Sequence, residues 1–440
     1  MSEFLAGFAE VDYTPKLGLQ LRGQQYERLA QSVRDPLLCN AVAMRCGDVA
    51  VVMVSVDVCF VTTEFVTETQ AEFAKRTGLP AQRLLVHTTH THVAPAAVAY
   101  HWATPDPNFL AKLKNDIVTA AHSALDKLEP VDVFSNSEKL DCLNWNRRSM
   151  YEDGTSTMHG SADRPGFVGT EDARDPNFSV MYFRNREGRI TGVICNFGTH
   201  PNCVENGHFY SADIPGEVRR LTKSILGAET GVVYLTGAAG NTSPIIHEKG
   251  VKEQPWMGEE GLHRAGLYLT GSISSQIAEA IEPVRSSTFG VAHTTVYVPM
   301  RPYPKPGERN YPEFWSDESK AYYQALEADW PRKVRDESPV EVRVSVIRIG
   351  DTVICTNPAE LFSEFALGIR EASPARVTLT SQLTDGYVGY LPTPEAFKRG
   401  GYETWPANTS KLVPEAGATI VEATTGLLGQ VFLKGRRSNE

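Results

Sequence analysis

The stretch AVAMRCGDVAVVMVSVDV, residues 41–58, decides the fold class of this chain of 440 residues. Two apolar, strand-like runs flank Gly47 and Asp48, a dipeptide typical of a tight hairpin turn. The same design recurs in FSVMYFRNREGRITGVICNFGTHP (178–201) and in VEVRVSVIRIGDTVICTNPAE (340–360). Each second strand leads into a polar residue with catalytic potential, and these are Asp57, His200 and Glu360.

Helical patterns lie between the predicted hairpins. A cap at Thr62 or Thr63 opens a periodic segment that closes on Gly78, and the strand RLLVHTTH follows, which predicts a βαβ unit. Further helices are predicted at 109–128, 262–281, 360–373 and 413–432.

These elements predict an α/β protein of the mixed α+β kind, with mixed β-sheets flanked by helices and a metal site at strand ends. No linker-like break interrupts residues 1–440, so we expect a single large catalytic domain without a separate C-terminal β-rich domain. The Pro- and Tyr-rich stretch 301–315 predicts a long ordered loop.

The composition disfavours several classes of partner. A formal net charge of −10 argues against nucleic acid or an anionic membrane surface. No apolar run approaches the roughly 20 residues of a transmembrane segment, and the N-terminus lacks the pattern of a secretory signal. The seven cysteines lack CxxC spacing, which is typical of buried free thiols. We therefore expect a cytoplasmic protein with a small-molecule substrate; the sequence leaves the oligomeric state open.

The segment VHTTHTHVAP, residues 86–95, concentrates three of the 11 histidines. In an extended segment His90 and His92 point to the same side, while His87 faces the opposite side. An H-x-H pair at a strand end can begin a metal site, but structural or surface histidines fit the same pattern.

Two other strand-end residues favour the metal hypothesis. His200 and Glu360 follow apolar strands, and two imidazoles with one carboxylate leave zinc an open position for hydrolysis. Taken singly, a core histidine and a helix N-terminal carboxylate remain alternatives. The Gly-rich loop GAAGNTSPI (237–245) matches neither a phosphate-binding loop nor a nucleophile elbow, so Ser243 is open to a substrate contact or a plain turn.

Six motifs of the chain occur in the order found in the neutral (non-lysosomal) ceramidase family. They are THTH (89–92), NFGTHP (196–201), SADIPGEVRR (211–220), GAAGNTSP (237–244), NPAE (357–360) and YVGYLPTPEAFKRGGYE (387–403). Over nearly its whole length, the chain resembles the catalytic domain of that family.

The resemblance implies a role for each matching residue. The zinc (Zn²⁺) ligands it implies are His90, His200, Glu360 and Tyr390. The residues it implies for catalysis and substrate contact are His92 and Tyr402 at the oxyanion, Ser243 near the scissile bond, and Arg148, with Arg147 as the alternative.

The function that we predict is hydrolysis of an N-acyl amide bond by metal-activated water. The family continues T-H-T-H with Ser-Gly-Pro-Gly-Gly, whereas this chain has VAPAA at 93–97, which predicts a different pocket wall. An acidic, cytoplasmic relative without a secretory signal or the family's additional β-rich domain is expected to act on a soluble substrate rather than a sphingolipid. Two alternatives stay open: a metal-dependent hydrolase of an ester, lactone or sugar derivative, and a non-catalytic metal-binding relative. Manganese, iron or nickel also suits such ligands.

Overall fold

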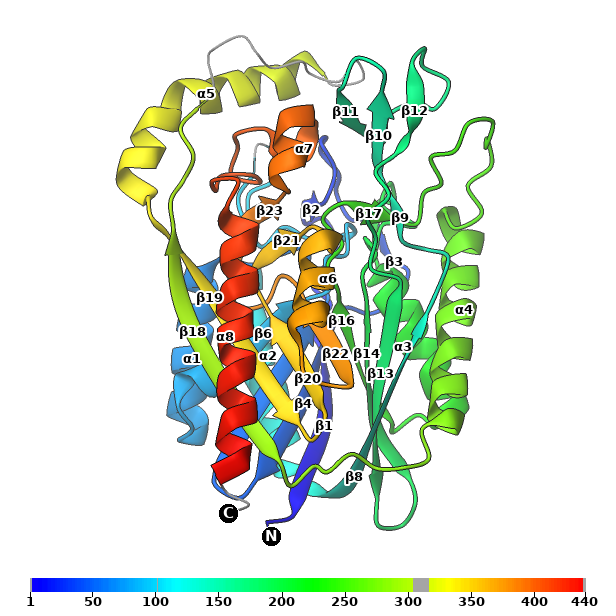
Figure 1. Ribbon diagram of the computed structural model, residues 1–440, viewed down its shortest axis with the longest axis vertical. Coiled ribbons are helices and arrows are strands. Elements are labelled where there is room, and N and C mark those ends of the chain that lie inside the picture. Colours follow the sequence, from blue (N-terminus) through cyan, green and yellow to red (C-terminus); the bar gives the residue numbers. More distant parts are fainter. Residues whose placement is uncertain (1, 101, 304–315, 438–440) are drawn as a thin grey trace.

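Three sections of β-sheet surround one central core, and a pair of helices covers the outer face of each section (Figure 1). The computed structural model describes residues 2–100, 102–303 and 316–437. The arrangement confirms the predicted class of mixed sheets flanked by helices. The assignment of residues 1–440 to one domain stays a prediction.

The larger sheet supplies two of the three sections. Its strands, in spatial order, are β16 (Gly231–Thr236), β14 (Ile190–Phe197), β13 (Asn177–Asn185), β8 (Glu129–Lys139), β1 (Phe4–Asp12), β4 (Leu38–Cys46), β5 (Val49–Val56) and β6 (Leu84–Thr88). The halves join only through a two-residue pairing of β1 with β8. The sheet bends there, and Phe8 of β1 packs on Gly192 and Gly231 of the other half, where a Cβ would lie 2.2 and 2.4 Å from its side chain.

The third section is a four-stranded sheet. It consists of β18 (Phe289–Val298), β19 (Val340–Ile349), β20 (Thr352–Thr356) and β22 (Val377–Ser381). Short strands lie outside both sheets: β2 (Leu21–Arg22), β3 (Ser32–Val33), β7 (Ala94–Pro95), β9 (Trp145–Asn146), β10 (Arg148–Tyr151), β11 (Ser156–Met158), β12 (Phe167–Thr170), β15 (Phe209–Tyr210), β17 (Thr242–Ser243), β21 (Ala359–Leu361) and β23 (Gly389–Leu391).

All three predicted hairpins are confirmed. The strand pairs β4–β5, β13–β14 and β19–β20 are antiparallel neighbours, joined by turns at the predicted Gly-containing positions. The predicted βαβ unit is also present, since β5 and β6 pair in parallel across α1 (Thr63–Thr77). Thr62 caps α1 by accepting from the amide of Phe65, and Gly78 ends it with φ of 72°.

Side chains alternate along the strands, so that one face of each sheet section packs in the central core and the other face packs against a pair of helices. Met53, Ile194 and Ile354, one from each section, are buried in the central core. The outer faces pack against α1 with α2 (Pro107–Asp126), α3 (Asp213–Leu226) with α4 (Gly258–Glu279), and α6 (Ser363–Ala372) with α8 (Ala416–Arg437). The remaining helices are α5 (Asp317–Glu337), α7 (Pro394–Arg399), and two 3₁₀ turns, Ala81–Arg83 and Tyr402–Thr404.

The sequence pattern did not predict three of the helices, α3, α5 and α7. Pro331 lies inside α5, where proline normally interrupts a helix, whereas Pro215 lies in the first turn of α3, where proline is tolerated. Only residues 301–303 of the predicted loop 301–315 lie within the described chain.

The closing helix α8 also has the length and composition of a membrane span over residues 416–433. Its side chains Ile420, Leu427 and Leu428 are nevertheless buried in the core that it shares with β19 and β20. We therefore interpret α8 as a core-covering helix.

The carboxyl ends of β6, β16 and β22, one strand from each section, lie next to one another. The hydroxyl of Thr236, the last residue of β16, donates to the carbonyl of Thr89, which follows β6, over 2.8 Å. The amide of Gln382, after β22, donates to the Thr236 carbonyl over 3.1 Å. Polar residues that follow these strands are thereby brought together.

Candidate metal centre

His90 lies two residues beyond β6, in a buried turn. Its φ of 71° shows that the segment is not extended there, so the alternation argued from an extended strand does not by itself place His90 beside His92. Nδ1 lies 2.9 Å from the carbonyl oxygen of Cys59 and therefore carries a proton. The other ring nitrogen, Nε2, faces His200 and Glu360. His87, by contrast, is a core histidine bonded to the Gln382 carbonyl and the Thr236 amide.

His200 mirrors this arrangement from the end of β14. Its Nδ1 lies 2.7 Å from the carbonyl oxygen of Ala239, in the Gly-rich loop, so the Nε2 lone pair is directed at His90. The two Nε2 atoms are 3.1 Å apart. Metal-binding histidines usually donate their other ring N–H to a carbonyl oxygen or a carboxylate in this way, which leaves the opposite nitrogen for the metal.

Glu360 completes the group from β21. Its Oε2 lies 3.2 Å from Nε2 of His90 and 3.6 Å from Nε2 of His200, and it is a buried oxygen without a hydrogen-bond partner. The other oxygen, Oε1, accepts from the Tyr387 hydroxyl over 2.7 Å. Burial raises the pKa of Glu360, but His90 and the phenols of Tyr390 and Tyr387 outweigh it and bring the pKa to about 2.

These donors surround a position that favours positive charge. Burial lowers the pKa of His90, but Cys59 and Glu360 outweigh burial and raise it to about 10. Two imidazole nitrogens and an unpartnered carboxylate oxygen, all within 4.8 Å of one another, fit a divalent metal ion. A second group, Cys59 with His90 and His92, competes for the same imidazole. There the Cys59 thiol faces Nδ1, which already bonds to a carbonyl, so the group with His200 fits better.

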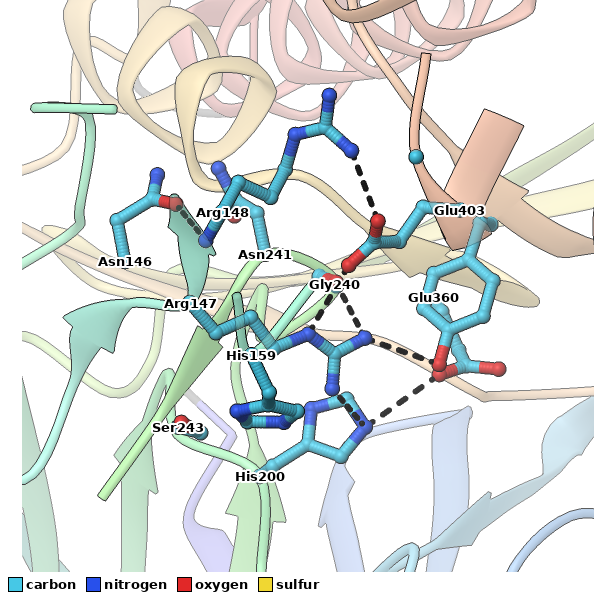
Figure 2. A network of polar contacts seen from close by, with 12 residues as sticks. Asn146, Arg147, Arg148, His159, His200, Gly240, Asn241, Ser243, Glu360 and Glu403 are labelled. Carbon is cyan, nitrogen blue, oxygen red and sulfur yellow. Dashed lines mark hydrogen bonds and ion pairs between the residues drawn. The ribbon is translucent and has the colours of Figure 1, made fainter. Parts of the chain in front are cut away.

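Tyr390 joins the group through strand pairing. In the parallel pair β21–β23 it lies opposite Glu360, and its hydroxyl accepts from Nη2 of Arg147 over 3.1 Å. Figure 2 shows Arg147 at the centre of this network. Its Nη1 lies 3.2 Å from Nε2 of His200, and its Nε donates to Glu403 over 3.1 Å.

Two of the three donors, His90 and Glu360, lie in the wall of a cavity of about 520 Å³, which is the size of a small-molecule site. His200 contacts both of them from outside the lining. His92 also lines this cavity, and its Nδ1 lies 2.9 Å from Oε2 of Glu205. Burial and the charge of His90 lower the pKa of His92, while burial raises the pKa of Glu205 to about 7. At neutral pH the pair can therefore hold a mobile proton beside the metal position.

Not every residue predicted for the site reaches the cavity. Tyr402 lies in the cavity wall and accepts from Nε2 of Gln25 over 3.1 Å. Ser243 is fully buried in β17 outside the wall, and its hydroxyl accepts from the Ile245 amide. Arg148 lies behind the wall, where Glu403 and Glu171 bind its guanidinium. Of the two neighbouring arginines, the structure brings Arg147 to the cavity.

From the sequence we predict no role for several residues that line the cavity. They include Arg22, Glu205, Tyr387 and the pair His159 and His247, whose ring nitrogens are 2.9 Å apart. Asp57, which follows β5 and had catalytic potential, is instead buried in an ion pair with Arg219 at 2.9 Å.

Comparison with known proteins gives one group of relatives. No protein-family model matches the chain. The chain is 27% identical to the neutral ceramidase of Pseudomonas aeruginosa over 176 residues, which cover 38% of this chain and 25% of that protein. The sequence match therefore spans about a quarter of the relative's length.

The fold is similar to two solved structures. One is the crystal structure of neutral ceramidase from Pseudomonas aeruginosa, with a TM-score of 0.76 and 18% identity, covering 99% of this chain and 75% of that chain. The other is a ceramidase complexed with C2, with a TM-score of 0.76 and 17% identity, covering 99% and 76%. Sequence and fold together confirm the relationship that the six motifs indicate.

Proposed function

The chain is related to the neutral ceramidases, and we propose that it is a metal-dependent hydrolase that cleaves an N-acyl amide bond. The observation that carries this proposal is the convergence of Nε2 of His90, Nε2 of His200 and the unpartnered Oε2 of Glu360 on one position, where His90 and Glu360 also line the cavity.

The proposed metal is zinc, held by His90, His200 and Glu360, with the Tyr390 phenol as the fourth ligand. When bound, Zn²⁺ supplies a Lewis acid that makes water nucleophilic near neutral pH and polarises a carbonyl group. The carbonyl oxygens of Cys59 and Ala239 orient the two imidazoles for this task.

The residues around the metal position supply donors for the reacting amide. His92 uses Nδ1 to contact Glu205, and its Nε2 bonds to none of the residues that the structure describes, which leaves Nε2 for the substrate. In our proposal this imidazole donates to the carbonyl oxygen as negative charge develops, and then to the leaving nitrogen. Tyr402 and Arg147 are further donors on the same wall.

Metal analysis of purified variants tests the proposal. We expect about one divalent ion per wild-type chain by mass spectrometry and its loss in His200→Ala and Glu360→Ala. His122→Ala is the matched control, because His122 lies exposed on α2, in contact with Asp126. Equal metal content in the wild type and both site variants would remove the basis of the proposal.

Turnover then separates the reaction classes. We expect the zinc-loaded wild type to cleave N-octanoyl amides faster than aryl esters or sugar lactones, and the two metal-free variants to cleave none of them. A metal-loaded protein that cleaves only esters or lactones would reassign the reaction while keeping the metal centre.

A further inference from the structure

Arg22 is placed beside the proposed site by two local contacts. It ends the short strand β2, where it pairs with Ala94 of β7. The next residue, Gly23, has a φ of 132° and packs so closely on His92 that a Cβ at Gly23 would lie 2.4 Å from that of His92. The Arg22 side chain is 5% exposed, and it lines the same cavity as His90 and Glu360.

The guanidinium of Arg22 has no acidic partner within the part of the chain that the structure describes. No carboxylate there lies within ion-pair distance, and the buried Nε has no hydrogen-bond partner. The nearest groups are aromatic, since the guanidinium carbon lies 3.8 Å from the ring centre of Tyr100 and 5.1 Å from that of Phe60.

Other buried arginines of the described chain have carboxylate or carbonyl partners for their guanidinium groups. Arg148 pairs with Glu403 and Glu171, Arg219 pairs with Asp57, and Arg28 donates to three backbone carbonyls. A buried cation that lacks both a carboxylate and a hydrogen-bond acceptor is costly, so its presence in a cavity wall points to a ligand that supplies them.

We propose that Arg22 binds a carboxylate of the substrate, so that the preferred substrates are N-acyl amino acids or closely similar N-acyl amides that carry one carboxylate. This inference rests on the proposed hydrolase function and names its substrate class. A planar guanidinium matches a carboxylate with two parallel hydrogen bonds. The neighbouring Gln25 and Tyr402 are neutral, so neither supplies a counter-charge to the guanidinium.

Arg22 also borders an adjoining cavity of about 480 Å³ that contains Glu64, Glu337 and Glu341. None of these carboxylates lies within 4.0 Å of the guanidinium, so they do not neutralise it. The aromatic rings of Tyr100 and Phe60 hold the guanidinium in place without using its N–H donors.

A matched pair of substrates tests the carboxylate contact. N-octanoylglycine carries the anion, and N-octanoylglycinamide is its neutral counterpart of similar shape. We expect the wild type to favour the anion in kcat/KM by about 30-fold, as for a buried charge pair, mainly through KM. Arg22→Met should remove this preference, so that the two substrates have equal kcat/KM values, and Arg22→Lys should keep part of it. The control Arg332→Met changes an exposed arginine of α5.

Binding to the chelated protein separates this inference from the hydrolase proposal. In calorimetry with EDTA-treated protein, which neither turns over nor offers a metal to the carboxylate, N-octanoylglycine should bind wild type more tightly than N-octanoylglycinamide, and Arg22→Met should abolish the difference. If that difference appears while the zinc-loaded wild type cleaves neither compound, the contact stands and the hydrolase proposal fails. Equal binding of the two compounds by wild type, or an unchanged preference in Arg22→Met and Arg22→Lys, overturns the contact. Tighter binding of N-octanoylaminomethylphosphonate overturns the choice of a carboxylate.

Discussion

Glu360 and Tyr390 occupy paired positions of β21 and β23, so a carboxylate and a phenol project side by side toward the imidazoles of His90 and His200. The pairing is parallel and involves only three residues of each strand. Its main-chain hydrogen bonds hold the phenol near the metal position independently of any bond that the hydroxyl makes.

Tyr390→Phe should therefore weaken metal binding without unfolding the protein. We expect the affinity for zinc to fall about 10- to 100-fold, because the fourth ligand is lost while the strand pairing stays. Competition with a chelating dye measures the affinity. Tyr297→Phe is the control, since Tyr297 is exposed on β18. Unchanged affinity in Tyr390→Phe would show that the phenol is not a ligand.

The pH dependence of turnover should report the pair His92 and Glu205. Burial raises the pKa of Glu205 to about 7, so below that pH the pair holds a proton and His92 presents Nε2–H to the cavity. Above it the proton is lost, Glu205 accepts from Nδ1–H, and Nε2 is no longer a donor. We therefore expect kcat to fall as the pH rises through about 7.

Glu205→Gln provides the test of that assignment. A glutamine does not titrate, so the descending limb near neutrality should disappear from the kcat profile of this variant, measured over a pH range that spans neutrality. A limb that keeps its position in Glu205→Gln would have to come from another group.

The parts of the fold that the sequence predicts are those with local signals. Period-two runs around Gly47 and Asp48, and their counterparts in the other two hairpins, define strands and turns within a few residues. The bend of the large sheet depends instead on Phe8 meeting Gly192 and Gly231, which are distant in the chain. Local patterns carry no information about such contacts.

The candidate site also contains residues that the sequence predicts and residues that only the three-dimensional structure reveals. His90, His200 and Glu360 can be nominated because each follows a predicted strand. Arg147 and Arg148 differ only in which side of a short segment they face, and the sequence cannot decide between them. An unpaired arginine such as Arg22 has no local signal, because the lack of a partner is visible only in three dimensions.

Asp57 should prove structural rather than catalytic. It is fully buried, pairs with Arg219, and accepts from the Leu38 amide over 2.8 Å. Asp57→Asn leaves a buried guanidinium without its counter-charge, so we expect a loss of about 3–5 kcal/mol in the free energy of unfolding, measured with urea, and unchanged metal content in the folded fraction.

The ion pair of Asp329 with Arg332 is exposed, and it serves as the control for the loss of stability expected in Asp57→Asn. It joins neighbouring turns of α5 on the surface, so Asp329→Asn should leave the urea midpoint unchanged. Equal effects of the two substitutions would mean that burial does not set the contribution of Asp57.

Gly23 should control the position of His92. Its φ of 132° disfavours any side chain, and an added Cβ would lie 2.4 Å from the Cβ of His92. Gly23→Ala must therefore displace the imidazole, and we expect kcat/KM to fall about 10- to 100-fold, as for loss of an oriented acid–base group.

Gly18→Ala is a matched control, because Gly18 also has a positive φ, of 91°, but nothing lies within 4 Å of its added Cβ. Both variants should lose some thermal stability through backbone strain, and only Gly23→Ala should lose activity at a temperature where both are folded. Equal kcat/KM values for the two variants would show that the contact between Gly23 and His92 does not position the imidazole.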